Sequence, residues 1–575
     1  MRTSSKRAKK ELALGEEPDD DAPHRVTLLD KLPAEVLHAA LTLCAAAAAT
    51  DVPSSPGSLN AIREVCRAME RGAAEVIARV SLSRAAALPA DLPRGLRNWQ
   101  SVSLYDVPLN ALEDASRLAG MIPKGAPLRA VQIIRCGLQP SGLEAVTAAL
   151  ARLTGLTELD LRGNCLHLPD ALEALGTVRH LRHLDLSGCN IHAIAAPGLA
   201  AGLRQLRCLE RLDLGNNMLS EDGIRHLSSS ALPYLTSLRH LGVGCINVGH
   251  PGMEEHLAPA LEHLTQLTHL DVSANLLLTQ GACALARPLR KMPNLRHLRA
   301  QGIMACAEGV RALVPALGAM TSLTRLDLGR NAMGPRGLYL MVPMLSASKG
   351  LRHVDLAENW FGALCYALSS ALQALRGITH LSLERNKIGD AATEGSRDGV
   401  ARLAICLSSM TALQSLDLGG NPLGAVGIEG LSGGLATLHL RRLRLNDCTI
   451  GAEGVSGLSQ ALCGLAPVLR ELDLGKNGWG AREVTALCPA LSGLSKLEVL
   501  DLSDNDIGGA ALTCAALPKI DGFVKQANAC TWMLGLALRR MSAIRHVGLV
   551  GCGLDYMQEE PCRARGVLTD RVEWR

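Results

Sequence analysis

Leucine and other apolar residues recur along most of the chain in one frame, which residues 156–166, LTELDLRGNCL, show in full. If the first leucine is position one, apolar residues occupy positions one, four, six and eleven, and Asn, Cys or a substitute occupies position nine. A unit that recurs every 20–50 residues or so is typical of a solenoid, in which each unit buries its apolar face on the next. The frame therefore predicts one repeat array.

The frame occurs sixteen times, and most copies begin 27 to 29 residues apart. The copies begin at Trp99, Leu128, Leu156, Leu181, Leu209, Leu238, Leu267, Leu295, Leu323, Leu351, Ile378, Leu413, Leu440, Leu469, Leu497 and Ile544. Only the units that begin at Ile378 and Leu497 are markedly longer, and their extra residues are expected in loops.

Two hydrophobic periods follow one another within each repeat. Positions three to six alternate polar and apolar residues, as in 158–161, which predicts a short strand with one buried face. Farther along, apolar residues fall at helical spacing, as at Val310, Leu313 and Leu317. Stacked strands lie about 4.8 Å apart but packed helices need about 8–10 Å, so the array is expected to curve into a horseshoe with its parallel strands on the concave face.

Position nine is expected to turn the chain after the strand. An Asn side chain can donate and accept hydrogen bonds at once, so an Asn column can join the backbone of neighbouring turns into a ladder. The column comprises Asn164, Asn217, Asn275, Asn331, Asn359, Asn386, Asn421, Asn477 and Asn505. Cysteine takes the same position at Cys136, Cys189, Cys448 and Cys552, and these are predicted to be buried free thiols.

The long unit and helices of the form GxxGLxxLxxAL resemble the ribonuclease-inhibitor-like class of leucine-rich repeat proteins. The resemblance covers roughly Trp99 to Leu554. It implies an α/β leucine-rich repeat solenoid that acts inside the cell and binds other proteins. We therefore expect the array to span residues 86–557, with a C-terminal tail at 558–575.

The N-terminal part of the chain has a different pattern. Residues 1–25 carry a basic and then an acidic cluster and are expected to be disordered, whereas 26–85 show apolar residues at helical spacing. Such a helical segment can cap the open end of the array. The order Leu32-Pro33-x-Glu35-Val36-Leu37, followed by Leu41 and by Val65-Cys66-Arg67, also resembles the F-box, which docks on Skp-family adaptors. The resemblance implies adaptor binding, and the apolar residues at helical spacing predicted to form that surface are Leu32, Pro33, Val36, Leu37, Leu41, Val65 and Met69.

Composition narrows the range of partners. The 59 Lys and Arg residues nearly balance the 55 Asp and Glu residues, so no overall field favours nucleic acid or an anionic membrane. The eighteen cysteines include no CxxC pair, and we find no secretory leader or run of eighteen apolar residues. These features predict a cytoplasmic protein, and the basic cluster at 6–10 adds a nuclear location as an alternative.

Positions three and five of each strand are expected to face a partner on the concave surface. Position three is often His or Arg and position five is often Asp, but the two columns run in parallel and do not converge on one point. Metal sites and catalytic sites need convergence, so we expect no enzyme activity, metal or cofactor. The predicted contact residues are His240, His269, His297, Arg299, Gln301, Arg325, His353 and Arg444.

Three functions fit these features. The F-box resemblance implies a substrate-recognition subunit of a cullin–RING ubiquitin ligase, which would hold the adaptor at one end and a target protein on the concave face. A plain protein-binding scaffold, similar to the recognition part of NOD-like receptors, is the main alternative. A Ran-type GTPase-activating protein is less favoured, because that family carries a long acidic C-terminal tail and this chain ends in Arg563 to Arg575 without one.

Overall fold

The computed structural model describes residues 79–83, 100–122, 125–362, 372, 377–390, 396–507, 529–541, 543–550, 552 and 572–573. Two compact units divide the chain, Met1–Asn247 and Val248–Arg575. The predicted adaptor-binding residues, which lie between 32 and 69, fall outside the described residues, so the adaptor surface remains a prediction.

The first unit contains parallel strands that pair in chain order, with a helical segment after most of them. Its elements are β1 (Arg79–Ser83), β2 (Ser101–Tyr105), α4 (Leu112–Met121), β3 (Ala130–Ile134), α5 (Pro140–Leu150), β4 (Glu158–Asp160), α6 (Pro169–Glu173), η3 (Ala174–Thr177), β5 (His183–Asp185), η4 (Ala193–Ala195), α7 (Ala196–Gln205), β6 (Arg211–Asp213), α8 (Ser220–Ser230), η5 (Leu232–Tyr234) and β7 (His240–Gly242).

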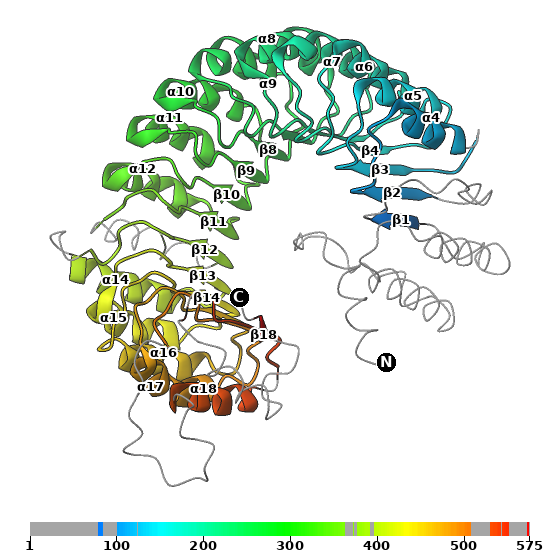
Figure 1. Cartoon of the computed structure of the whole chain (residues 1–575). Coiled ribbons are helices and arrows are strands. Elements are labelled where there is room, and N and C mark those ends of the chain that lie inside the picture. The colour runs from blue at the N-terminus through cyan, green and yellow to red at the C-terminus, as the bar shows by residue number, and fades with distance from the viewer. Residues whose placement is uncertain are drawn as a thin grey trace, which may run out of the picture. The chain divides into compact units, whose positions relative to one another are not determined.

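The second unit continues the same alternation, and Figure 1 shows its helices α10, α11 and α12 together along one side of the strands. Its first elements are η6 (Gly252–Leu257), α9 (Ala258–Leu261), β8 (His269–Asp271), α10 (Leu278–Leu289), β9 (His297–Arg299), α11 (Cys306–Gly318), β10 (Arg325–Asp327), α12 (Gly334–Ala347), β11 (His353–Asp355) and β12 (His380–Ser382). Its later elements are α14 (Ser396–Ser409), β13 (Ser415–Asp417), α15 (Gly424–Ala436), β14 (Arg442–Arg444), α16 (Val455–Leu465), β15 (Glu471–Asp473), α17 (Ala481–Ser492), β16 (Val499–Asp501), α18 (Ala529–Arg540), β17 (His546–Gly548) and β18 (Val572–Glu573).

Each of the sixteen predicted copies contains a strand that begins at position three, and a helical segment follows most of these strands in the described part of the chain. In the copy that starts at Leu323, the residues at positions one, four, six and eleven are Leu323, Leu326, Leu328 and Met333, and all four are buried. These side chains form the core between the strands and the helices. Within each unit the described strands pair in parallel with their successors, as expected for a leucine-rich repeat solenoid.

Two strands lie outside the predicted array. β1 falls in the segment expected to be helical, and β18 falls in the expected C-terminal tail. The sequence of β1, RVSLS, alternates polar and apolar residues, and this strand pairs in register with β2. The pairing of β1 therefore follows from its period of two, although the full repeat frame is missing there.

The asparagine ladder has the predicted geometry. Asn359 is fully buried, and its Oδ1 accepts hydrogen bonds from the backbone N–H groups of Asn331 (3.0 Å) and Met333 (3.5 Å) in the preceding turn. Its Nδ2 donates to the carbonyl oxygens of Leu328 (2.9 Å) and Leu356 (3.0 Å). One side chain thus satisfies buried polar groups of two repeats, which is why Asn recurs at position nine.

Cysteine at position nine replaces Asn as a hydrogen-bond donor to the neighbouring turn. The Cys189 thiol donates to the carbonyl oxygen of Leu161 at 3.1 Å, and the Cys448 thiol donates to that of Leu418 at 3.3 Å. Burial raises the pKa of both thiols to about 12, so they stay protonated and unreactive at neutral pH. The prediction of buried free thiols is confirmed for this column.

No helix in the part of the chain that the structure describes has the length and apolar character needed to cross a membrane.

Candidate functional site

The strands of the second unit carry two rows of polar side chains on the face opposite the buried position-four residues. The position-three row contains His269, His297, Arg325, His353 and His380, which are partners in the parallel register. The position-five row runs alongside it and contains Asp271, Arg299, Asp327, Asp355 and Ser382. We call the residues His269, His297, Arg299, Gln301, Arg325, Asp327 and His353 the β8–β11 patch.

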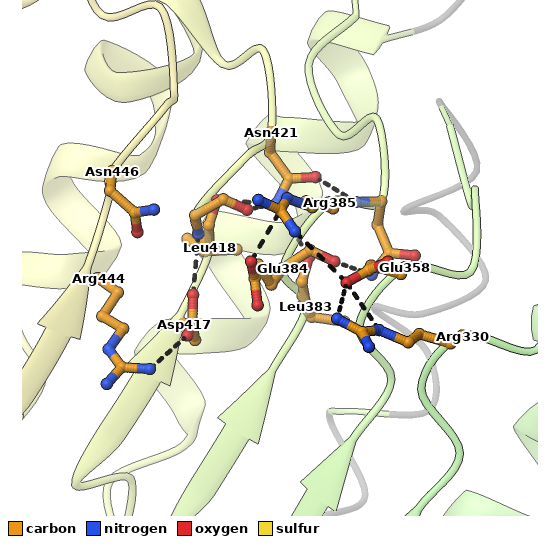
Figure 2. Close-up of polar contacts among 12 residues, drawn as sticks. Arg330, Glu358, Leu383, Glu384, Arg385, Asp417, Leu418, Asn421, Arg444 and Asn446 are labelled. Carbon is orange, nitrogen blue, oxygen red and sulfur yellow. Dashed lines mark hydrogen bonds and ion pairs between the residues drawn. The ribbon is translucent and has the colours of Figure 1, made fainter. Parts of the chain in front are cut away.

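The structure brings six of the eight predicted contact residues into this patch. Two lie elsewhere: His240 is on β7 in the first unit, and Arg444 is on β14. Five strand spacings separate β14 from β9, which corresponds to about 24 Å. Arg444 Nη1 lies 3.4 Å from Asp417 Oδ2 and forms its own lateral pair (Figure 2). Arg444 and Arg299 are therefore separate features of the sheet.

Arg299 bridges two carboxylates in the β8–β11 patch. Its Nη1 lies 3.0 Å from Asp271 Oδ2 on one neighbouring strand, and its Nε lies 3.5 Å from Asp327 Oδ2 on the other. Arg325 also donates from Nε to Asp327 Oδ2, at 3.2 Å. The expected lateral charge pairing is present, and the Arg299 side chain nevertheless remains 51% exposed. The guanidinium can thus contact a partner without leaving its carboxylates.

Asp327 differs from the other aspartates of its column. In eight repeats the position-five Asp accepts a hydrogen bond through Oδ1 from the backbone N–H two residues later. These aspartates are Asp160, Asp185, Asp213, Asp271, Asp355, Asp417, Asp473 and Asp501. Asp327 Oδ1 has no hydrogen-bond partner, although its side chain is only 5% exposed. This buried acceptor is the most unusual polar atom of the patch, because such atoms are normally satisfied.

The surroundings of Asp327 explain its electrostatics. Burial raises the pKa of Asp327, and repulsion from Asp355 adds to this effect, while the charges of Arg325 and Arg299 oppose it. His353 Nε2 lies 3.8 Å from Asp327 Oδ1, which is too far for a hydrogen bond. The carboxylate is therefore held by two guanidinium groups on one side and is left without a donor on the other.

Histidine rings form most of the position-three row. The rings of His269 and His297 meet edge to face with centroids 4.1 Å apart, and those of His353 and His380 stack at 5.2 Å. Burial lowers the pKa of His353 to about 3, and the charge of Arg325 and the neighbouring imidazoles add to this effect. His353 is therefore neutral at pH 7, and it presents an aromatic ring beside the charged groups.

The charged side chains that follow strands β10, β11 and β12 are paired with one another. Arg330 Nη2 lies 2.9 Å from Glu358 Oε1, and Arg385 Nη1 lies 3.5 Å from the same oxygen. Arg385 Nε is also 3.5 Å from Glu384 Oε1, as Figure 2 shows. Burial and repulsion from Asp417 raise the pKa of Glu384. This network pairs its own charges, whereas in the β8–β11 patch the Oδ1 of Asp327 lacks a hydrogen-bond donor.

The patch does not have the chemistry of a metal site. Among the described residues, no group of three His, Cys, Asp or Glu side chains is placed to hold a metal ion. The two rows follow the strands in parallel, as the sequence predicts, so the arrangement suits contact with an extended surface rather than reaction at one atom.

Known proteins share this repeat. A family profile described as "Leucine Rich repeat" matches residues 179–196, 319–342, 409–432, 438–459 and 493–514. Pig ribonuclease inhibitor is 32% identical over 153 residues, which are 22% of this chain and 33% of that protein. The chain is a leucine-rich repeat protein of the ribonuclease-inhibitor-like class.

Other leucine-rich repeat proteins resemble parts of the chain. The mouse "NACHT, LRR and PYD domains-containing protein 12" is 30% identical over 234 residues, which are 36% of this chain. The chain spans 21% of that relative's length and 33% of the pig inhibitor's length. Among solved structures, an LRR protein of Leptospira interrogans is 16% identical, with 77% of this chain and 93% of that chain covered and a TM-score of 0.39.

Sequence reasoning identified the neighbourhood of Arg299 but did not single out Asp327. The triplet Arg-Leu-Asp at 325–327 also occurs at 211–213, where Asp213 accepts the usual backbone hydrogen bond. Asp417 and Asp473 also lie beside an Arg at position five of a neighbouring strand and keep the usual hydrogen bond. What distinguishes Asp327 is the combination of Arg325 at position three of its own strand and Arg299 at position five of the neighbouring strand. The sequence feature that marks Asp327 is therefore a combination of residues from two repeats. It can be recognised only when it is known which strands pair.

Proposed function

We propose that this leucine-rich repeat protein is a non-catalytic recognition protein that holds a protein partner on the β8–β11 patch. The observation that carries the proposal is the buried Oδ1 of Asp327, which lacks a donor beside the half-exposed guanidinium of Arg299. The oxygen is covered in the free chain, so a partner's hydrogen-bond donor would reach it by displacing a neighbouring side chain of the patch. An unsatisfied buried acceptor is costly, and this cost favours such a rearrangement.

The composition of the patch supports a protein partner. Arginine is enriched among the residues that dominate binding energy at protein interfaces, and aromatic rings add contact area around it. His297 and His353 are only partly buried, so their rings are accessible beside Arg299. The four strands β8 to β11 extend over about 15 Å, which suits a protein surface better than a single small group.

Charge reversal of Arg299 tests this proposal. A partner is identified by affinity purification on the tagged chain, and its Kd is measured by calorimetry for the wild type and for Arg299→Glu. We expect Arg299→Glu to weaken binding by at least about tenfold, because the substitution removes a hot-spot contact and repels Asp271 and Asp327. An unchanged Kd would place the recognition surface elsewhere.

Arg444→Glu is the matched control. Arg444 occupies position five, is half exposed and pairs with one aspartate, as Arg299 pairs with two. The substitution makes the same change of charge about 24 Å away, so its effect should stay within about twofold. Equal losses in both variants would indicate a nonspecific effect of charge and would contradict a local patch.

A finer role follows from the F-box resemblance of the N-terminal segment. We propose that this segment lets the protein serve as a substrate-recognition subunit of a cullin–RING ubiquitin ligase, with a Skp-family adaptor bound through the surface that includes Val36 and Leu37. Only the sequence supports this role. Changing Val36 and Leu37 to Asp should abolish adaptor capture in a pull-down, and a wild-type chain that captures no adaptor leaves the plain scaffold role.

The proposed place of action is the cytoplasm, with the nucleus as an alternative. The proposal is supported by the free thiols of twelve cysteines in the described part of the chain, which suit a reducing compartment. Imaging of the tagged full chain in cells tests it, and secretion of the chain into the medium would contradict it.

A further inference from the structure

Position ten, directly after the asparagine of the turn, carries large exposed apolar side chains in the repeats of β8, β9 and β11. Leu276 is 58% exposed, Met304 is 43% exposed and Trp360 is 58% exposed. The smaller Ala332 occupies the same position in the β10 repeat between them. We call Leu276, Met304, Ala332 and Trp360 the rim ridge. Clusters of large exposed apolar side chains mark interaction sites in soluble proteins.

The backbone at this position does not favour such side chains. Met304, Ala332 and Trp360 have φ angles of 56°, 49° and 59°, in the left-handed region that favours Gly and Asn. Other repeats place Gly137, Asn190, Asn247 and Gly478 at the same position with positive φ. Stability would therefore select Gly or Asn here, and a bulky exposed Trp requires another explanation.

Hydrogen bonds between successive turns place the ridge residues side by side. The N–H of Cys306 donates to the carbonyl oxygen of Asn331 at 3.0 Å, and the N–H of Gly334 donates to that of Asn359 at 2.9 Å. Successive turns therefore step with the strands, about 4.8 Å apart, and the ridge extends over about 14 Å. This length matches a short peptide segment with two or three apolar side chains on one side.

The ridge ends at a cation. Position ten of the next repeat is Lys387, which is exposed, and no described carboxylate pairs with its ammonium group. The nearby Arg385 is already paired with Glu358 and Glu384. An apolar strip that ends in an unpaired ammonium group is complementary to apolar side chains followed by a carboxylate.

We infer that the rim ridge binds a peptide segment of a partner protein in which apolar residues are followed by Asp or Glu. The apolar side chains pack on Leu276, Met304 and Trp360, and the carboxylate pairs with Lys387. This site is separate from the β8–β11 patch and does not depend on binding at Arg299.

A peptide library tests the inference without a known partner. Phage that display random peptides of about twelve residues are selected on the full-length chain and counter-selected on the double variant Met304→Asn/Trp360→Asn. We expect enrichment of peptides with two or three apolar residues followed by Asp or Glu. A synthetic copy should bind the wild type and lose at least about tenfold in affinity for the double variant. A library with no enrichment over the double variant overturns the inference.

Charge exchange tests the Lys387 contact. Lys387→Glu should weaken the acidic peptide severalfold, and replacement of the peptide's carboxylate residue by Lys should recover the loss. If the peptides bind the Lys387→Glu variant with the wild-type affinity, the proposed pairing of the peptide's carboxylate with Lys387 is wrong. Arg299→Glu should leave peptide binding unaltered, so failure of the patch and failure of the ridge are distinguishable.

The double variant also shows whether the substitutions affect folding and whether a second copy of the chain, rather than a peptide, covers the ridge. Asn already occupies this position at 190 and 247, so the double variant should melt at the wild-type temperature or above it. If the wild type is a dimer in light scattering and the double variant is a monomer, the ridge contacts a second copy of the chain and the acidic-segment inference is wrong.

Discussion

The asparagines of position nine and the aspartates of position five occupy the same repeats but behave differently. Asn331, Asn359 and Asn421 are all fully buried, and each joins its own turn to the neighbouring turn in the same way. The aspartates also share one hydrogen bond, but Asp327 departs from it. A column that holds the fold repeats its contacts, so a departure from a repeated contact indicates a local function.

The largest expected effect comes from the asparagine ladder. Asn359→Ala removes the partners of buried backbone groups in two turns, so it should lower the free energy of unfolding by about 3–4 kcal/mol. Urea titration followed by circular dichroism measures this change. Asn446→Ala, at a partly exposed Asn of position seven, should cost less than about 1 kcal/mol. Equal costs would mean that the ladder does not hold the turns together.

Sequence predicts the repeating contacts well, because each of them recurs in many repeats, as the nine asparagines of position nine do. Leu326 and Asn359 are buried as expected from their positions alone. The terminal strands β1 and β18 were missed, because their sequences lack the leucine frame. The side chain of Asp327 could not be predicted either, because its orientation depends on Arg299 from the preceding repeat and Arg325 from its own strand.

The next largest expected effect is on the pH dependence of the free energy of unfolding. His353 has a lowered pKa in the folded chain, whereas in the unfolded chain it takes up a proton below its ordinary value of about 6.5. Its contribution to stability is therefore present above about pH 6.5 and is lost as the pH falls toward 3. Between pH 7 and pH 5 the wild type should lose about 1–2 kcal/mol more than His353→Gln.

Parallel melting curves of the wild type and His353→Gln at the two pH values measure this difference. The raised pKa of Asp327 acts in the opposite direction, because a carboxyl group that protonates more readily in the folded chain gains stability as the pH falls. Asp327 is present in both proteins, so the comparison isolates the imidazole. Identical pH dependence in the two proteins would contradict a neutral, partly buried His353.

The smallest expected effect is a difference in stability between alanine variants of two aspartates on neighbouring strands. Asp355→Ala removes the acceptor of the Ala357 N–H at 2.9 Å and should cost about 1 kcal/mol. Asp327→Ala removes no backbone hydrogen bond and relieves a buried carboxylate, so it should cost at least about 0.5 kcal/mol less. Chemical denaturation at pH 7 measures both variants. A larger cost for Asp327 would show that its ion pairs with Arg299 and Arg325 stabilise the fold.

Site-specific photo-crosslinking tests the central claim most directly, namely that a protein partner binds the β8–β11 patch. The photoreactive residue p-benzoylphenylalanine replaces Gln301 in the patch or, as a control, Tyr339, which is 70% exposed on α12. The proposal predicts a protein adduct from residue 301 that disappears in an Arg299→Glu background, and no such adduct from residue 339. An adduct from residue 339 alone, or one from residue 301 that persists with Arg299→Glu, would contradict it.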